Sequence, residues 1–415
     1  MERLGDLYAR ISMKLAFLIT HFTPPIGGAE RQADFLCRMV SAEVGGCEVV
    51  TTRFRPELPR RSVSEGVVIR RLATFGRRRV RLASNLATSF LYFLWHGRRY
   101  RIVHAHCLSA FSLGGIVAAK LWGCRVMVKV CSIGKDGEAN TVKRGLLGTI
   151  LWKLFLKTDL FVAVTPSVRE EMIECGVSPD RIVIVPNAIM VNRAELADPA
   201  RRAAARAVLG LPDRPVVLFL GRLVRQKGVD LLARAWTDVA QDGRAMLALV
   251  GDGPEAERLV EWRRAAGCEA SVRLFGWQSD PEPFYRASDI FVFPSWSETF
   301  GNALAEAMAH GLAVVTTPVG LARHWIRDGE NGVVISHDGL AELTEALNRL
   351  IQDASLRERL GQQARKDALA LFSQETVIST YLDLYRRLDH IPNASSETEA
   401  EVTQRGGKHA GNRTV

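Results

Sequence analysis

The sequence predicts an α/β protein made of two doubly wound, Rossmann-like domains that face each other across a cleft. Short apolar, β-branched runs alternate with helical patterns along most of the 415 residues, which is typical of parallel sheets covered by helices on both faces. These runs fall into two sets with a strand-free stretch between them, and two sets predict two such domains. The length agrees with two or three domains.

The predicted strands are short runs bounded by glycine, proline or polar residues. The first set is Leu15–Thr20, Glu48–Thr52, Val67–Arg71, Ile102–Ala105, Val126–Val130 and Leu160–Val164. The second set is Val216–Gly221, Met246–Val250, Val272–Phe275, Ile290–Phe293, Ala313–Thr316 and Val333–Ile335.

The domain boundary is predicted after Val185–Pro186–Asn187, where the strand signal stops. We expect an N-terminal domain over residues 13–190 and a C-terminal domain over residues 196–374. Helical spacing of apolar residues predicts an amphipathic helix over 375–390. The polar, glycine-rich stretch 393–415 predicts a disordered tail.

Charge is distributed unevenly between the two predicted domains. Residues 1–195 hold 29 Lys and Arg against 16 Asp and Glu, a net charge of +13, and the remainder has a net charge of −3. The basic half indicates either an acidic partner or a merely solvated surface. We expect no nucleic-acid partner, because no recognition motif accompanies the charge.

The seven cysteines are scattered, and no two have CxxC spacing. This pattern favours free thiols in a reducing compartment over disulfides or a zinc site. We also expect no signal peptide and no transmembrane helix, because every apolar run is too short. The predicted location is therefore the cytoplasm. The cysteines are Cys37, Cys47, Cys107, Cys124, Cys131, Cys175 and Cys268.

The segment from Asp289 to Gly311 carries the strongest functional signal. A buried strand is followed by the loop 296–302 and then by a helix over 303–310, with Gly311 as its C-cap. The helix N-terminus lies at the carboxyl end of the strand, where its free N–H groups and dipole suit a diphosphate. Gly301 allows the backbone to approach a ligand closely.

Two glutamates flank this predicted anion site. Glu298 precedes the helix, and Glu306 lies about one and a half turns within it. A carboxylate repels phosphate but accepts hydrogen bonds from vicinal hydroxyl groups. We therefore expect Glu306 to bind a ribose diol and Glu298 a hydroxyl of a transferred sugar.

A second loop supplies positive charge. The strand ending at Gly221 is followed by Arg222 and, five residues later, by Lys227. Arginine offers a planar fork and lysine a point charge, which together suit a leaving diphosphate. In isolation, such a pair could equally be surface residues.

With these motifs together, the chain resembles the retaining glycosyltransferases of family 4, which have the GT-B fold. The motifs are Gly-Arg-Leu-x-x-x-Lys-Gly at 221–228, Gly-Asp-Gly-Pro at 251–254, and Ser297–Gly311 with two glutamates eight positions apart. The resemblance covers about residues 13–390.

The resemblance implies a function and a site. The chain would transfer a sugar from a nucleotide-diphosphate donor to a glycan or lipid-linked acceptor, with retention of the anomeric configuration. It would need no metal, and the sugar nucleotide would be a co-substrate rather than a cofactor. Arg222, Lys227 and Glu298 would act in catalysis. The donor-binding residues would be Gly28, Gly221, Arg222, Lys227, Glu298, Thr299, Phe300, Gly301, Asn302 and Glu306.

The acceptor half departs from the family pattern. Gly28 lies in a Gly-Gly-x-Glu turn of the family type, and His106 ends a strand where the family often has a histidine. The next strand ends in Lys129–Val130–Cys131, with Cys131 where a second histidine is common. We retain His106 and Lys129 as acceptor-side candidates. A further departure, over 321–325, leaves acceptor recognition open.

Two basic, apolar segments, 77–95 and 143–157, predict either peripheral contact with an anionic membrane or core helices with solvated ends. Such contact would place the protein at the inner face of the membrane. An acceptor in cell-envelope or exopolysaccharide synthesis would suit that position.

Two rival functions remain open. A sugar-nucleotide epimerase shares this fold and would turn over the donor without an acceptor. A catalytically silent binding protein is conceivable because of Cys131, although the intact donor motifs argue against it.

Overall fold

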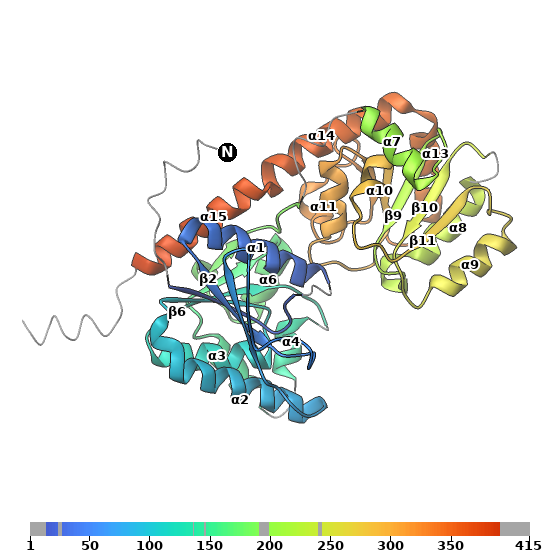
Figure 1. Cartoon of the computed structure of the whole chain (residues 1–415). Helices are drawn as coiled ribbons and strands as arrows, with labels where there is room; N and C mark the ends of the chain where they lie inside the picture. Colours follow the sequence, from blue (N-terminus) through green and yellow to red (C-terminus); the bar gives the residue numbers. More distant parts are fainter. Residues whose placement is uncertain are drawn as a thin grey trace, which may run out of the picture. The chain divides into compact units, whose positions relative to one another are not determined.

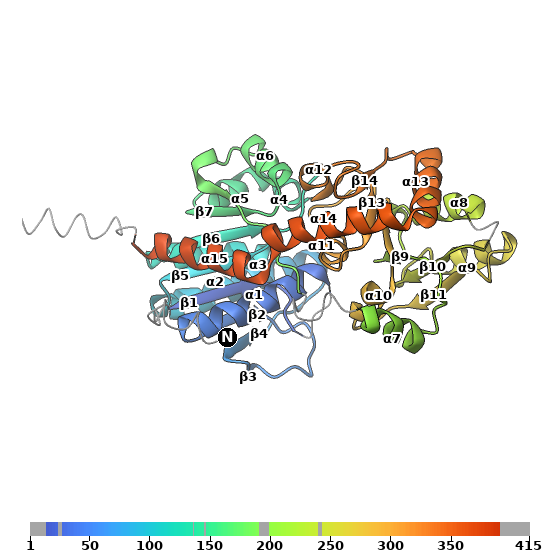
Figure 2. The ribbon, with the colours of Figure 1, turned by 90° about the horizontal axis from the view of Figure 1, so that it is seen from above.

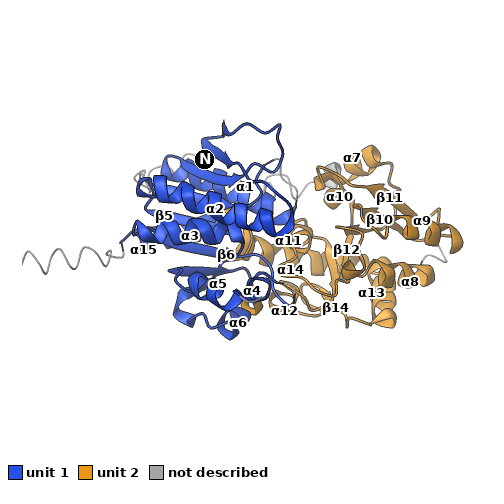
Figure 3. Cartoon of the chain, turned by 90° about the horizontal axis from the view of Figure 1, so that it is seen from below, with its two compact units in different colours: residues 1–164, 168–185, 378–415 blue, residues 165–167, 186–377 orange. Residues whose placement is uncertain are grey.

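The computed structural model describes residues 14–23, 27–135, 137–144, 147–190, 199–239 and 243–390. It divides into two compact units (Figure 3). Unit 1 contains residues 1–164, 168–185 and 378–415, and unit 2 contains residues 165–167 and 186–377. The predicted tail over 393–415 lies outside the described residues.

Unit 1 is built on an eight-stranded sheet of order β3-β4-β2-β1-β5-β6-β7-β8. The five central strands are largely buried and rich in apolar residues, as expected of parallel strands covered on both faces. The strands are β1 (Leu15–Ile19), β2 (Cys47–Thr52), β3 (Arg61–Ser64), β4 (Val67–Leu72), β5 (Ile102–His106), β6 (Arg125–Val130), β7 (Leu160–Ala163) and β8 (Ile182–Ile184).

Helices cover both faces of this sheet. Figures 1 and 2 show α1 on one face and α2 with α3 on the other. The helices are α1 (Gly28–Val44), α2 (Arg78–His96), α3 (Ala110–Leu121), α4 (Glu138–Lys143), α5 (Gly148–Phe155), α6 (Pro166–Glu174) and α15 (Gln374–His390), with 3-10 turns η1 (Gly97–Arg99) and η2 (Pro179–Arg181). The final helix, predicted over 375–390, belongs to unit 1 from Ile378 onward.

The prediction of a wholly parallel N-terminal sheet is wrong at one edge. Strand β3 is antiparallel to β4, and the two are joined by Glu65 and Gly66, both with positive φ, as a tight hairpin turn requires. Strand β3 escaped prediction because its sequence, Arg-Ser-Val-Ser, has no apolar run. Strand β8 was not predicted because it has only three residues.

Unit 2 is built on a six-stranded parallel sheet of order β11-β10-β9-β12-β13-β14. Each of its strands lies where the sequence predicts one. They are β9 (Val216–Leu220), β10 (Met246–Val250), β11 (Val272–Gly276), β12 (Ile290–Phe293), β13 (Ala313–Thr316) and β14 (Val333–Val334).

In unit 2 too, helices pack on both faces of the sheet. Figure 2 shows α8 and α13 on one face and α10 with α7 on the other. The elements are α7 (Pro199–Leu209), η4 (Arg225–Lys227), α8 (Val229–Val239), α9 (Ala256–Ala265), α10 (Glu282–Ala287), α11 (Asn302–Ala309), α12 (Ala322–Trp325), α13 (Leu340–Gln352) and α14 (Ala354–Phe372).

Close backbone contacts fix the loops at the carboxyl edge of the unit 2 sheet. Gly228 has φ +68°, and a Cβ atom there would lie 1.9 Å from the carbonyl oxygen of Pro294. The loop after β9 therefore lies directly against the loop after β12. A Cβ on Gly251 would similarly lie 1.8 Å from the Gly221 carbonyl oxygen, which ties in the loop after β10.

No helix in the described parts of the chain is both long enough and apolar enough to cross a membrane.

The contact between Gly228 and Pro294 predicts a position-specific loss of stability. Gly228→Ala should destabilise unit 2 through the left-handed φ, at about 1 kcal/mol or more, and through overpacking, at about 1–3 kcal/mol. Gly267→Ala is the matched control, because Gly267 has φ +65° but a Cβ there would meet no described atom within 4 Å. Urea denaturation followed by circular dichroism would measure both, and equal losses would contradict the prediction.

Candidate functional site

Two loops of unit 2 join at the carboxyl edge of the sheet and bring together residues 71 positions apart in the sequence. The Trp296 amide donates to the Gln226 carbonyl at 2.8 Å, and the Gln226 side-chain amide donates to the Ser297 carbonyl at 3.2 Å. These bonds hold Lys227 beside Glu298, and the two side chains form an ion pair.

The ion pair is largely shielded from water. The Lys227 side chain is 22% exposed and that of Glu298 13% exposed, so their attraction is screened less than that of a surface pair. The Lys227 ammonium also lies 5.2 Å from the centre of the Phe293 ring. Both charged groups are therefore held in fixed positions at the carboxyl edge of the sheet.

Arg222 leaves the same loop as Lys227 and is exposed. Its guanidinium forms no ion pair with any residue that the structure describes, so its donors are available to a ligand. Gly221, directly before it, has φ +157° at the end of β9.

Helix α11 begins beside this charge pair. Its N-cap is Gly301, at φ +97°, so no side chain caps the helix. The Leu304 and Ala305 amides donate to the Gly301 carbonyl. Over the described residues, no group accepts a hydrogen bond from the Asn302 or Ala303 amide. Free amides at a helix N-terminus form a site for an anion.

The neighbouring residues hold this loop in place. The Phe300 side chain is buried. The centre of its ring lies 5.4 Å from the centre of the Phe372 ring and 6.3 Å from that of the Trp325 ring. The Thr299 carbonyl accepts a hydrogen bond from the Thr165 hydroxyl at 3.4 Å. The Asn302 side chain accepts one from Asn187 at 2.8 Å. Thus Thr299, Phe300 and Asn302 have structural contacts whether or not they contact a donor.

Glu306 lies within α11 and is half-buried. Its carboxylate accepts a hydrogen bond from the Tyr285 hydroxyl at 2.9 Å, which sets its orientation. Sequence analysis does not identify Tyr285, because it comes from α10 and carries no motif. The end of α11 also differs from the prediction: Ala309 is the last helical residue, His310 is the C-cap, and Gly311, at φ +74°, follows.

The predicted acceptor-side residues of unit 1 are buried. His106 and Lys129 lie opposite each other on β5 and β6 and are only 2% and 3% exposed. Burial lowers the pKa of His106 well below its usual value, and burial also lowers the pKa of Lys129. Their roles toward an acceptor stay predictions. Gly28 is the first residue of α1.

The structure also brings together a set of residues that sequence analysis missed. Cys107 directly follows β5, Cys131 directly follows the neighbouring strand β6, and Glu138 is the first residue of α4. One ligand atom from each lies within 4.8 Å of the others. Sequence spacing does not link them, although the adjacency of two strand ends could have suggested the cysteine pair.

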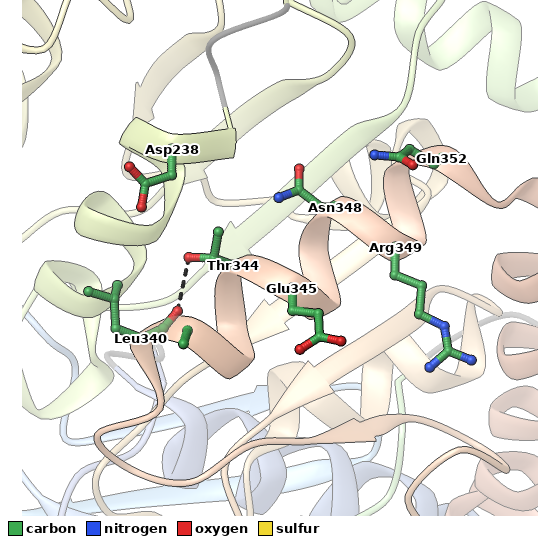
Figure 4. Close-up of a pocket in the computed structure, with 8 residues that line it drawn as sticks. Asp238, Leu340, Thr344, Glu345, Asn348, Arg349 and Gln352 are labelled. Atoms are coloured by element: carbon green, nitrogen blue, oxygen red, sulfur yellow. Dashed lines mark hydrogen bonds between the residues drawn. The ribbon is translucent and has the colours of Figure 1, made fainter.

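An open depression of about 780 Å³ lies elsewhere on unit 2, between α8 and α13 (Figure 4). It is lined by residues of α13 and by Asp238, and includes none of the predicted donor residues. Its Thr344 hydroxyl donates to the Leu340 carbonyl within the same helix. The depression is therefore separate from the candidate site.

Comparisons with known proteins agree with the two-unit division. Residues 201–367 match the family profile described as "Glycosyl transferases group 1", and residues 26–193 match the profile described as "Glycosyltransferase Family 4".

Two curated relatives illustrate the similarity. D-inositol 3-phosphate glycosyltransferase 1 of Catenulispora acidiphila is 30% identical over 366 residues, covering 82% of this chain and 81% of the relative. Lipopolysaccharide core biosynthesis glycosyltransferase LpsE of Rhizobium meliloti is 33% identical over 235 residues, covering 55% of this chain and 65% of that relative.

Solved structures share the fold at low sequence identity. HepE of Anabaena, solved in complex with UDP, superposes with a TM-score of 0.75 at 18% identity, covering 90% of this chain and 100% of HepE. The lipopolysaccharide glycosyltransferase WaaG gives a TM-score of 0.69 at 19% identity, covering 89% and 99%. These likenesses confirm two Rossmann-like domains of the GT-B type. Because a relative at 30% identity aligns over four fifths of both chains and the profiles match both halves, this chain belongs to the group 1 glycosyltransferases.

Proposed function

We propose that this glycosyltransferase takes a sugar from a nucleoside-diphosphate donor and adds it to a glycan or lipid-linked acceptor with retention. The observation that carries the proposal is the meeting of Lys227, Glu298 and the uncapped N-terminus of α11 at one edge of unit 2. HepE, of the same fold, has been solved with UDP-glucose, which supports this donor class. The name of LpsE supports an acceptor in envelope glycan synthesis.

In this proposal, each group at the site has a distinct partner on the donor. Lys227, Arg222 and the free amides of α11 bind the diphosphate, because all present positive charge or N–H donors. Glu298 accepts a hydrogen bond from a hydroxyl of the sugar. Glu306, oriented by Tyr285, accepts hydrogen bonds from the ribose diol. Gly221 and Gly301 leave room for the donor next to the backbone.

The ion pair suggests how the charged groups change partners when a donor binds. The Glu298 carboxylate neutralises Lys227, so the shielded ammonium has a counterion. When a diphosphate arrives, it replaces the carboxylate on Lys227 and frees Glu298 for the sugar. The two charges thus exchange partners during binding.

Bond breaking builds negative charge on the leaving diphosphate and positive charge on the sugar. We propose that Arg222, Lys227 and the N-terminus of α11 stabilise the leaving group, since fixed electrostatic groups often supply the largest catalytic contribution. A phosphate oxygen on the same face takes the acceptor's proton, so no protein base and no metal takes part in this step.

Lys227→Ala should lower the transfer rate by about 10²–10³-fold, as expected for the loss of one charge-stabilising group. It should also weaken binding of free UDP. Lys366→Ala, which removes an exposed lysine of α14, should leave both unchanged. Sugar release from a radiolabelled donor measures transfer, and near-wild-type turnover of Lys227→Ala would refute the assignment.

Glu298→Gln should separate the two roles of that carboxylate. It should lower transfer and weaken binding of the intact sugar nucleotide, but should not weaken binding of the free nucleoside diphosphate, because the competing carboxylate is gone. Thermal shift with a panel of sugar nucleotides and nucleoside diphosphates would identify the donor and give both affinities. Equal weakening of both ligands would contradict the exchange of partners.

We also propose that unit 1 contacts an anionic membrane through α2. One side of this helix packs in the core, where Tyr92 and Phe93 are buried together with small polar residues, and other apolar residues of the helix are exposed. Ser84, Asn85 and Ser89 are buried, where α2 packs tightly against Gly114 of α3. Leu91 and Trp95 are 51% and 81% exposed.

The same helix begins with basic residues. Arg78, Arg79 and Arg81 are exposed in its first turn, next to Val80 and Leu82, which are each 56% exposed. The inner side of the helix packs in the core, as the alternative interpretation of this segment expects, and its exposed side carries these basic and apolar residues. Basic and apolar groups on one exposed helix suit the surface of an anionic bilayer.

Membrane contact through α2 predicts that Trp95→Ala combined with Arg79→Glu will reduce co-sedimentation with phosphatidylglycerol vesicles at low salt. Trp277→Ala is the matched control, because Trp277 is 71% exposed but lies in unit 2. The wild-type protein should bind phosphatidylglycerol and not phosphatidylcholine vesicles. No sedimentation of the wild type with anionic vesicles would sink the proposal.

A further inference from the structure

Cys107 and Cys131 meet because the sheet of unit 1 places their strands side by side. Strands β5 and β6 are parallel, with His106 opposite Lys129. Cys107 follows the first strand directly, and Cys131 lies two residues after Lys129. Cys107 has φ +69°, a backbone conformation that non-glycine residues rarely adopt. The two thiols therefore approach each other at the carboxyl edge of the sheet.

Glu138 completes the group from the start of α4. Its carboxylate accepts a hydrogen bond from the Leu108 amide at 2.6 Å and one from the Cys131 amide at 3.2 Å. These two amides belong to the ends of both strands, so the carboxylate is fixed between them. The oxygen bonded to the Cys131 amide also accepts a hydrogen bond from the Ser132 hydroxyl at 3.4 Å, whereas the oxygen bonded to the Leu108 amide keeps a lone pair for another partner.

The distances suit a small divalent cation. The two sulfur atoms and a carboxylate oxygen lie within 4.8 Å of one another. Around tetrahedral zinc, with bonds of about 2.0–2.3 Å, such ligands lie about 3.5–3.8 Å apart. A contraction of at most about 1.0–1.3 Å, within reach of side-chain rotation, would close the group around the ion.

The surrounding charge also fits. Two thiolates and one carboxylate carry a charge of −3, which a divalent cation reduces to −1. Lys129, only 3% exposed, interacts electrostatically with both thiols and forms no ion pair with a carboxylate in the described part of the chain. Its positive charge balances the remainder, so that the cluster with zinc is neutral overall and suited to a half-buried position.

We propose that Cys107, Cys131 and Glu138 bind one thiophilic divalent cation, with Zn²⁺ the preferred ion. Two sulfur ligands and one oxygen ligand favour zinc over magnesium or calcium, which take oxygen ligands. All three residues are partly accessible, which leaves the fourth coordination position to water. The ion ties together the loops after β5 and β6 in unit 1. It takes no part in the proposed donor chemistry of unit 2.

The test measures metal directly, so its outcome does not depend on activity. The full-length protein is purified under reducing conditions, stripped with a chelator and titrated with Zn²⁺ against a chromophoric competitor. Cys107→Ser/Cys131→Ser is compared with Cys175→Ser, which removes a half-buried thiol outside the cluster. Co²⁺ substitution of wild type and Glu138→Gln provides a spectroscopic readout, because thiolate-to-cobalt charge transfer reports sulfur ligation.

The proposal predicts one Zn²⁺ per wild-type chain, retained in Cys175→Ser and weakened at least 100-fold in the double variant. Glu138→Gln should weaken binding by a smaller factor while keeping the thiolate–cobalt band. Circular dichroism would verify that each variant is folded. Substoichiometric binding by the wild type, equal binding by the double variant, or a Cys107–Cys131 disulfide under the same reducing conditions would overturn it.

Discussion

The candidate site of unit 2 depends on one steric constraint, the approach of the Gly228 backbone to the carbonyl of Pro294. Only glycine fits there, because its φ is +68° and a Cβ would lie 1.9 Å from that oxygen. The contact fixes the loop after β9 against the loop after β12, which sets Lys227 beside Glu298. Gly320 repeats the same arrangement one strand further, since a Cβ there would lie 2.4 Å from the Phe300 carbonyl oxygen. Close backbone packing thus holds the charged groups and the start of α11, in addition to the side-chain contacts of Gln226, Phe300 and Asn302.

Lys227 of unit 2 and Lys129 of unit 1 lie in contrasting electrostatic environments. In unit 2, Lys227 is partly accessible and paired with a carboxylate that a diphosphate can replace. In unit 1, Lys129 is buried, lies 5.9 Å from the centre of the Tyr381 ring and has no carboxylate partner among the described residues. One arrangement suits exchange with an anionic ligand, and the other suits permanent balance of buried negative charge. The same type of sheet edge therefore suits the proposed donor site in one unit and the proposed cation site in the other.

Where prediction from sequence failed, the physical cause can be named. Strand β3 has no apolar pattern because, as an edge strand in a hairpin, it is largely exposed. Helix α2 packs in the core through Tyr92 and Phe93, but it also buries small polar residues because α3 approaches closely at Gly114. A Cβ on Gly114 would lie 2.1 Å from the Leu86 carbonyl oxygen. Neither the hairpin edge nor the close helix contact leaves a periodic signal that identifies it.

The sequence by itself determined the two Rossmann-like domains, and it was enough to predict a set of donor residues that includes Arg222, Lys227, Glu298 and Glu306. This was possible because strand, loop and helix follow one another in the chain, so the residues of each motif are local. The tertiary structure decided which local pieces meet. It paired Lys227 with Glu298, gave Glu306 its partner Tyr285, and gathered Cys107, Cys131 and Glu138. Those contacts depend on strand order and register, which connect residues distant in the chain and therefore leave no local pattern.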